Sequence, residues 1–70
     1  SLPGLVVDIY GTTAVVQCHS VGMFHAREMI ADAILAVYGS AITAVYDKSS
    51  QTVPFKANLN AHDGYLRGEP

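Results

Sequence analysis

The sequence predicts an α+β fold, a small two-layer sandwich in which one helix covers a mostly antiparallel sheet. Two runs with β-strand character stand near the start of the chain, separated by a glycine-containing turn. A segment with apolar residues at helical spacing follows, and two shorter β-rich segments come after it. The order strand, strand, helix, strand, strand lets one helix cover one face of the sheet, and 70 residues make at most one domain.

The first two strands are predicted over Leu5 to Tyr10 and over Ala14 to His19. The first run reads LVVDIY and the second AVVQCH, and each contains a pair of valines. The residues between them, Gly11, Thr12 and Thr13, form the kind of short glycine-containing connection that is typical of a turn. We therefore expect a β-hairpin.

A helix is predicted from Met23 to Tyr38. Its apolar residues recur at i, i+3, i+4, i+7, i+8 and i+11, which is one stripe of an amphipathic helix. The stripe consists of Ala26, Met29, Ile30, Ala33, Ile34 and Val37. Gly39 follows at the position where a left-handed C-cap favours glycine. We expect the stripe to face the sheet.

A third strand is predicted over Ile42 to Asp47, and a last short strand from Tyr65 to Arg67, after an Asp-Gly turn. The stretch between them begins with two serines, contains a proline and is irregular. It fits either a short helical turn capped by a serine or an extended segment around Val53 and Phe55. The pattern leaves both alternatives open.

The alternation along the strands assigns side chains to the two faces of the sheet. On the face covered by the helix we expect Leu5, Val7, Ile9, Val16 and Ile42. On the opposite face we expect Val6, Asp8, Tyr10, Val15, Gln17, His19, Thr43 and Val45. This second set is too apolar for a face in plain solvent and too polar for a core. Such mixed surfaces suit a domain interface or an oligomer contact.

The composition limits the partners of the chain. Half of the residues are hydrophobic, whereas a chain of this length buries only about 60% of its unfolded surface, so we expect some apolar surface to face a partner. The net charge is −2, and four basic side chains are too few for strong binding to a phosphate backbone. The sequence has no uncharged run near the roughly 20 residues that span a bilayer and no signal-peptide pattern, so we expect a cytoplasmic protein. A single cysteine excludes an internal disulfide.

No residue pattern predicts a catalytic, cofactor-binding or metal site in this segment. Cys18 and His19 are neighbours on a strand and point to opposite faces, so Cys18 is interpreted as a structural thiol. The helix entrance from Ser20 to Arg27 could hold an anion, but an ordinary cap is the favoured interpretation. Asp8 and Asp47 have no acid or base partner at a spacing that indicates catalysis.

Four residues are candidates for a surface that contacts RNA or a neighbouring domain. They are Tyr10, His19, Arg27 and Lys48. The set combines an aromatic ring with an imidazole and two cationic groups. Because basic residues do not interleave with the tyrosines along the chain, base stacking is the less favoured interpretation for the rings.

Three stretches of the chain resemble markers of one protein family. LPGLVVDIYG (2–11), AVYDKSS (44–50) and GYLRGEP (64–70) are similar, in the same order, to segments of the S-adenosylmethionine-dependent large-subunit ribosomal RNA cytosine-C5 methyltransferases. The chain departs from the family at Lys48, where members often have an arginine. In that family this region is a small α/β domain between an N-terminal RNA-binding PUA-like domain and a C-terminal Rossmann-like catalytic domain.

On this resemblance, residues 1–70 are expected to form a single accessory domain excised from a longer methyltransferase chain. The segment itself would hold no cofactor, and the parent chain would bind S-adenosylmethionine. Its partners would be the flanking domains and, through the parent, ribosomal RNA, with no membrane involved. An alternative of a different class is a free-standing homodimeric interaction module that pairs through the mixed sheet face. A domain that binds an anion or small ligand at the helix entrance is a third, less favoured alternative.

Overall fold

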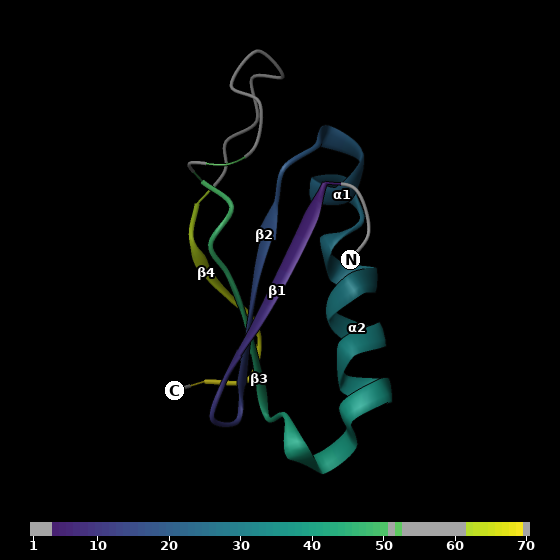
Figure 1. Ribbon diagram of the computed structural model, residues 1–70, viewed down its shortest axis with the longest axis vertical. Coiled ribbons are helices and arrows are strands. Elements are labelled where there is room, and N and C mark those ends of the chain that lie inside the picture. The colour runs from purple at the N-terminus through teal and green to yellow at the C-terminus, as the bar shows by residue number, and fades with distance from the viewer. Residues whose placement is uncertain (1–3, 51, 53–61, 70) are drawn as a thin grey trace.

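The computed structural model describes residues 4–50, 52 and 62–69. Four strands form one sheet in the order β1-β2-β3-β4, and the helices lie together on one of its faces (Figure 1). The elements are β1 (Leu5–Tyr10), β2 (Thr13–Cys18), α1 (Val21–His25), α2 (Arg27–Tyr38), a 3₁₀ turn η1 (Gly39–Ala41), β3 (Ala44–Asp47) and β4 (Gly64–Arg67). The predicted two-layer α+β sandwich is confirmed.

The sheet is mixed, with an antiparallel pair at each side. β1 and β2 pair antiparallel with Val7 opposite Val16, and β3 and β4 pair antiparallel with Tyr46 opposite Tyr65. β2 and β3 are parallel, because the helices carry the chain back along the sheet before β3 begins. The predicted turn of the first hairpin is confirmed, and Gly11 has a φ of 60°, in the left-handed region that favours glycine.

The third strand begins at Ala44, two residues later than predicted. The N–H groups of Thr43 and Ala44 both donate to the carbonyl oxygen of Thr12, at 2.8 and 3.4 Å, so the ladder starts after an irregular step. The predicted second and fourth strands differ from β2 and β4 by one residue at their ends. The stretch around residues 53–55, for which the sequence leaves two alternatives, lies outside the described residues.

This irregular step corrects the predicted place of Val45. Strict alternation from Ile42 would turn Val45 away from the helices, yet the two side chains are only 4% and 0% exposed. Both belong to the core cluster, which consists of Ala14, Val16, Ala31, Ile34, Ile42 and Val45. Thr43 and His19, expected on the opposite face, are exposed and lie just outside the strands.

The helical segment is divided into two helices, where the sequence predicts one from Met23. α1 begins at Val21, because the Ser20 hydroxyl oxygen accepts a hydrogen bond from the N–H of Met23 at 3.1 Å and caps the first turn. α1 and α2 meet at Ala26, whose φ and ψ are −90° and 4°. The predicted end is confirmed, since Gly39 follows α2 with a φ of 58°. No helix of the described residues is long and apolar enough to cross a membrane.

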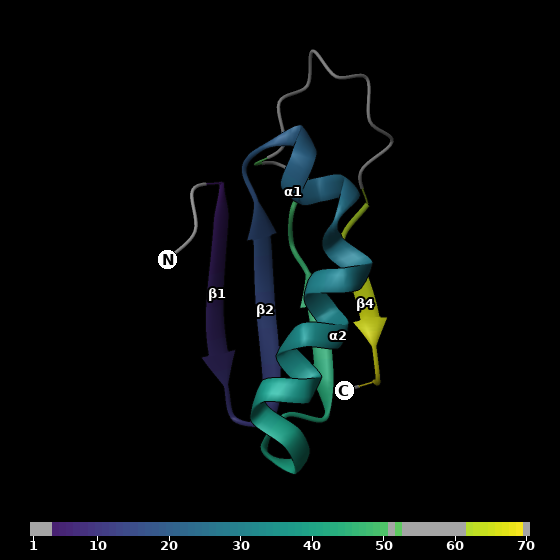
Figure 2. The ribbon, with the colours of Figure 1, turned by 90° about the vertical axis from the view of Figure 1, so that its right-hand side faces the viewer.

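The predicted stripe of α2 is only partly the stripe that faces the sheet. The side chains of α2 that pack against the core are Ile30, Ala31, Ile34 and Leu35. Met29 and Val37, predicted to be buried, are 69% and 79% exposed. The fully buried strand side chains lie on β2 and β3, and Arg67 of β4 pairs with Glu28 and Asp32 of α2. The helix is therefore held over the centre and the β4 side of the sheet (Figure 2).

One consequence is that β1 is only partly covered. Leu5 is half-buried, but Val7 and Ile9, both predicted to face the helix, are 37% and 43% exposed. In the part of the chain that the structure describes, no helix covers the opposite face of the sheet (Figures 1 and 2). By the strand register, that face carries Val6, Asp8, Tyr10, Val15, Gln17, Tyr46 and Tyr65.

Candidate functional site

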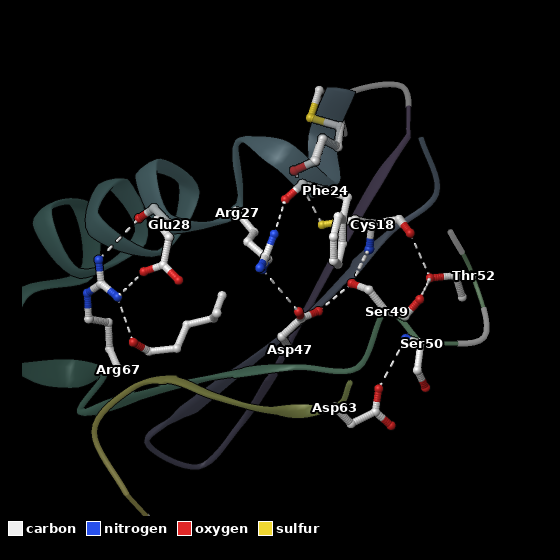
Figure 3. Close-up of polar contacts among 12 residues, drawn as sticks. Cys18, Phe24, Arg27, Glu28, Asp47, Ser49, Ser50, Thr52, Asp63 and Arg67 are labelled. Atoms are coloured by element: carbon white, nitrogen blue, oxygen red, sulfur yellow. Dashed lines mark hydrogen bonds and ion pairs between the residues drawn. The ribbon is translucent and has the colours of Figure 1, made fainter. Parts of the chain in front are cut away.

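Polar residues gather at the edge of the sheet where β2 and β3 end. The two strands are parallel, so their carboxyl ends lie side by side. Cys18 ends β2, Asp47 ends β3, Ser49 and Thr52 follow β3, and Arg27 approaches from the start of α2 (Figure 3). We call these five residues the polar cluster.

Hydrogen bonds join the polar cluster between distant parts of the chain. The hydroxyl of Ser49 accepts from the backbone N–H of Cys18 at 2.9 Å and donates to Oδ1 of Asp47. The hydroxyl of Thr52 donates to the carbonyl oxygen of Cys18 at 2.7 Å. These bonds fix the segment that follows β3 onto the end of β2 (Figure 3).

Arg27 connects the polar cluster to the helices. Its Nε lies 3.8 Å from Oδ2 of Asp47, a residue that is only 2% exposed. A buried carboxylate needs such partners, because an unpaired charge in the interior is costly. The guanidinium also lies 4.0 Å from the centroid of the Phe24 ring and donates to the Phe24 carbonyl oxygen at 2.8 Å. That carbonyl stands at the junction of α1 and α2, which gives a physical reason for the break in the helix.

Cys18 is held as a neutral, buried thiol. Burial is the largest effect on the pKa of the thiol and raises it. Among the smaller effects, the hydrogen bond with Ser49 and the charge of Arg27 lower the pKa, and the charge of Asp47 raises it. A thiol with a raised pKa carries little thiolate at neutral pH and is a poor nucleophile. Among the described residues, every buried side-chain nitrogen and oxygen has a hydrogen-bond partner. The polar cluster is therefore arranged to rigidify the fold.

A small polar hollow opens beside the cluster. It has a volume of about 230 Å³ and is lined by Gln17, Lys48, Ser50, Thr52 and Asp63. The backbone N–H of Ser50 donates to Oδ1 of Asp63 at 3.1 Å. One cation and one carboxylate line the hollow, so its charge favours neither an anion nor a cation. Within the described ranges, no three His, Cys, Asp or Glu residues are placed so that they could hold a metal ion.

The structure brings three of the four candidate contact residues to the same end of the sheet. His19 and Lys48 follow β2 and β3 directly and are exposed. Arg27 belongs to the polar cluster, and 32% of its side chain remains exposed. Tyr10 ends β1 at the opposite end of the sheet, next to the hairpin turn, and is 65% exposed. These four residues therefore do not form one continuous site.

Sequence reasoning missed two features of this domain. Ser49 and Thr52 are hydroxyl residues placed directly after an apolar strand, and that position was the only local signal of their role. Their partners on β2 lie 31 and 34 positions away in the sequence. On the uncovered sheet face, the rings of Tyr46 and Tyr65 pack edge to face with centroids 4.9 Å apart. That contact depends on the pairing of β3 with β4.

An apolar groove lies on the other face, between β1 and α2. It has a volume of about 240 Å³ and is lined by Leu5, Val7, Ile30, Ala33, Ile34, Val37 and Tyr38. All seven lining side chains are uncharged, and the tyrosine hydroxyl is the only polar group among them. We call this feature the β1–α2 groove.

Comparison with known proteins gives one informative similarity. No family model matches the sequence. The chain is 34% identical over 68 residues to a protein of Aeromonas salmonicida (strain A449) named ribosomal RNA large subunit methyltransferase I. The match includes 97% of this chain but only 17% of that protein, so the chain spans less than a fifth of its relative. The chain is thus similar, along nearly its whole length, to a short part of an rRNA large-subunit methyltransferase, in agreement with the resemblance of its sequence to rRNA methyltransferases.

Proposed function

We propose that this chain is the non-catalytic middle domain of an S-adenosylmethionine-dependent methyltransferase that acts on C5 of a cytosine in large-subunit ribosomal RNA. The domain links and orients an RNA-binding PUA-like domain and a Rossmann-like catalytic domain. The catalytic domain binds the cofactor, and the whole protein acts in the cytoplasm. The observation that carries the proposal is the 34% identity over 68 residues to a part of an rRNA methyltransferase.

The use of the polar groups supports a linking role. Asp47, Ser49 and Cys18 are buried and bonded to one another, so they stiffen the end of the sheet. A stiff domain can hold two neighbours at a fixed orientation, provided that it offers them surfaces. The uncovered sheet face with Tyr46 and Tyr65 and the β1–α2 groove are such surfaces.

We assign to this domain a minor share of RNA binding. Arg27 and Arg67 are already paired with carboxylates of the chain. His19 and Lys48 are exposed at the end of the sheet and are the residues we assign to RNA, whereas Tyr10 at the other end suits a contact with a neighbouring domain. Affinity for a phosphate backbone grows with the number of cationic contacts, so the PUA-like domain would carry most of the binding.

The experiment that tests the proposal is deletion of the gene that encodes this segment, followed by mapping of C5-methylcytosine in large-subunit RNA. We expect one methylated cytosine to be lost and to return when the whole gene is supplied. A gene variant with a disrupted glycine-rich strand-to-helix cofactor motif downstream of this domain should fail to restore it. An unchanged methylation map, or a gene without such a motif, would refute the proposal.

A binding measurement tests the non-catalytic assignment by itself. The 70-residue chain, titrated with S-adenosylmethionine in a calorimeter, is expected to give no heat of binding, whereas the whole polypeptide is expected to bind the cofactor. Saturable binding to the short chain would contradict the assignment of the cofactor to the neighbouring domain.

The homodimeric module remains the second candidate, and the exposed edge of the sheet favours it. β1 is an edge strand, and its large side chains Val6, Val7, Ile9 and Tyr10 are 39%, 37%, 43% and 65% exposed. Sedimentation velocity of the 70-residue chain over a wide concentration range separates the two candidates. A monomer at every concentration supports the middle-domain proposal, and a stable dimer supports the module.

A further inference from the structure

The sheet is too wide for the helix that covers it. Four strands spaced about 4.8 Å apart present a face roughly 15 to 20 Å wide, whereas one helix with its side chains is about 10 Å across. α2 lies over β2, β3 and β4, and β1 stands beside it (Figure 2). The width left over β1 is therefore roughly 5 to 10 Å, and one further helix beside α2 would cover it.

The side chains around this space are apolar and exposed. On β1, Val7 and Ile9 are 37% and 43% exposed on the face that carries the helices. On α2, Val37 is 79% exposed and Ala33 is also exposed, and both line the β1–α2 groove, which runs between the two elements. No part of the chain that the structure describes covers these side chains. Val37 and Ala33 belong to the predicted helix stripe, and Val7 and Ile9 belong to the strand face that is predicted to meet it.

The chemistry of the groove restricts what can occupy it. Its seven lining side chains carry no formal charge, so a charged group buried there would be left without a partner, at a cost of several kcal/mol. Ala33 lines the wall that α2 offers, and a small residue at that position lets another helix approach to the usual 8 to 10 Å between axes. The geometry thus suits an amphipathic helix with an uncharged aliphatic stripe.

The size of the groove argues against a second copy of this chain. A stable interface between two free proteins involves roughly 20 to 30 residues on each side, whereas seven residues line the groove. A small apolar contact can still hold when the two parts are tethered, because the effective concentration is then in the millimolar range. The rRNA methyltransferase that this chain resembles extends well beyond the matched 17% of its length, and a polypeptide of the same build would supply such a tether.

We propose that the β1–α2 groove is the docking site of an amphipathic helix that belongs to another part of the same polypeptide. The helix lies beside α2 and completes the helical layer over β1, so that the sheet is covered along its full width. The inference rests on the proposed function in one respect: it requires a polypeptide longer than these 70 residues.

The test is chemical protection of the groove in the whole polypeptide. Val37→Cys places a thiol in the groove, and Ala36→Cys places one on the neighbouring exposed position of α2, outside the groove. Each variant is treated with N-ethylmaleimide, both as the 70-residue chain and as the whole polypeptide, and the labelled peptide is measured by mass spectrometry. We expect the thiol of Val37→Cys to react about tenfold or more slowly in the whole polypeptide, because labelling then needs local opening. The thiol of Ala36→Cys should react at similar rates in both forms.

Three results would overturn the inference. Equal rates for Val37→Cys in both forms would mean that the groove is open to solvent in the whole polypeptide. Protection of Val37→Cys in the 70-residue chain that increases with concentration would mean that a second copy is the occupant. Equal protection at Ala36→Cys would mean that a broad surface covers α2 rather than a helix in the groove. In each case, loss or retention of C5-methylcytosine in the deletion strain still decides the proposed function separately.

Discussion

Cys18 is a residue whose surroundings should make the stability of the domain depend on pH. Burial of the thiol is the main cause that raises its pKa above the ordinary value of 9.0. The folded state therefore keeps the proton longer than the unfolded state does. The stabilisation is fully present below the unfolded pKa and is lost as the pH rises through the folded pKa.

We therefore predict that the urea midpoint of the wild-type chain falls as the pH rises above the ordinary thiol pKa of 9.0. In Cys18→Ala the fall should be smaller, because the contribution of the thiol is removed. At neutral pH the variant should be less stable than wild type, since the thiol fills a buried site. Parallel pH profiles of the two proteins would show that Cys18 contributes nothing to the dependence.

Ser49 is predicted to be the most sensitive hydroxyl of the polar cluster. Ser49→Ala leaves the buried N–H of Cys18 without its acceptor and removes the hydroxyl that donates to Asp47. An orphaned buried donor costs about 1 to 3 kcal/mol, and more where a charged group also loses a bond. Ser50→Ala is the matched control, because this side chain is exposed and its change should stay within about 0.5 kcal/mol. Denaturant unfolding of both variants measures the difference, and equal midpoints would refute the role given to Ser49.

At the scale of elements, the local sequence pattern predicts which strands and helices form better than it predicts which of their side chains face the core. The runs of β-branched residues and the 3.6-residue period placed every described strand and the helical region, because those signals are local. These local signals do not predict the break between α1 and α2 at Ala26. At the break, Arg27 donates to the Phe24 carbonyl oxygen and pairs with Asp47, which lies twenty residues further along the chain. The place of Val45 was also wrong, because strict alternation was broken before β3 began.

Two aspartate substitutions on α2 distinguish the observed helix face from the predicted stripe. Ile34 is 8% exposed and Val37 is 79% exposed, although both belong to the predicted stripe. Ile34→Asp should unfold the chain, because the carboxylate would be buried without a partner at a cost of several kcal/mol. Val37→Asp should leave the far-ultraviolet circular dichroism and melting temperature of the 70-residue chain close to wild type. Similar losses in both variants would mean that α2 is rotated from the position described.

At the scale of the whole molecule, the sequence predicts the types of the candidate contact residues but not which of them lie together. Lys48 and His19 share one end of the sheet because β2 and β3 are parallel, and no local pattern fixes that pairing. Tyr10 is separated from them for the same reason, since β1 runs the other way and ends at the hairpin turn. The residue types could be chosen from sequence, but their grouping depends on strand order. The uncovered groove, in contrast, can be expected from the numbers of predicted elements, because one helix is narrower than a sheet of four strands.

The close packing of the chain after β4 against the start of β3 depends on Gly68. Its φ is 70°, and a Cβ atom there would overlap the carbonyl oxygen of Thr43 and press on Ala44. Gly11 has a similar φ of 60° but has no atom within 4 Å of such a Cβ, so Gly11→Ala tests backbone strain alone, about 1 to 2 kcal/mol. Gly68→Ala carries the same strain and must also displace the backbone before β3, which adds about 1 to 3 kcal/mol. In urea unfolding, Gly68→Ala should therefore be the less stable of the two, and hydrogen exchange of the β3 amides should be faster in it. If the two variants unfolded at the same urea concentration, the end of β4 would not be held against the start of β3, and the fourth strand would contribute little to the sheet.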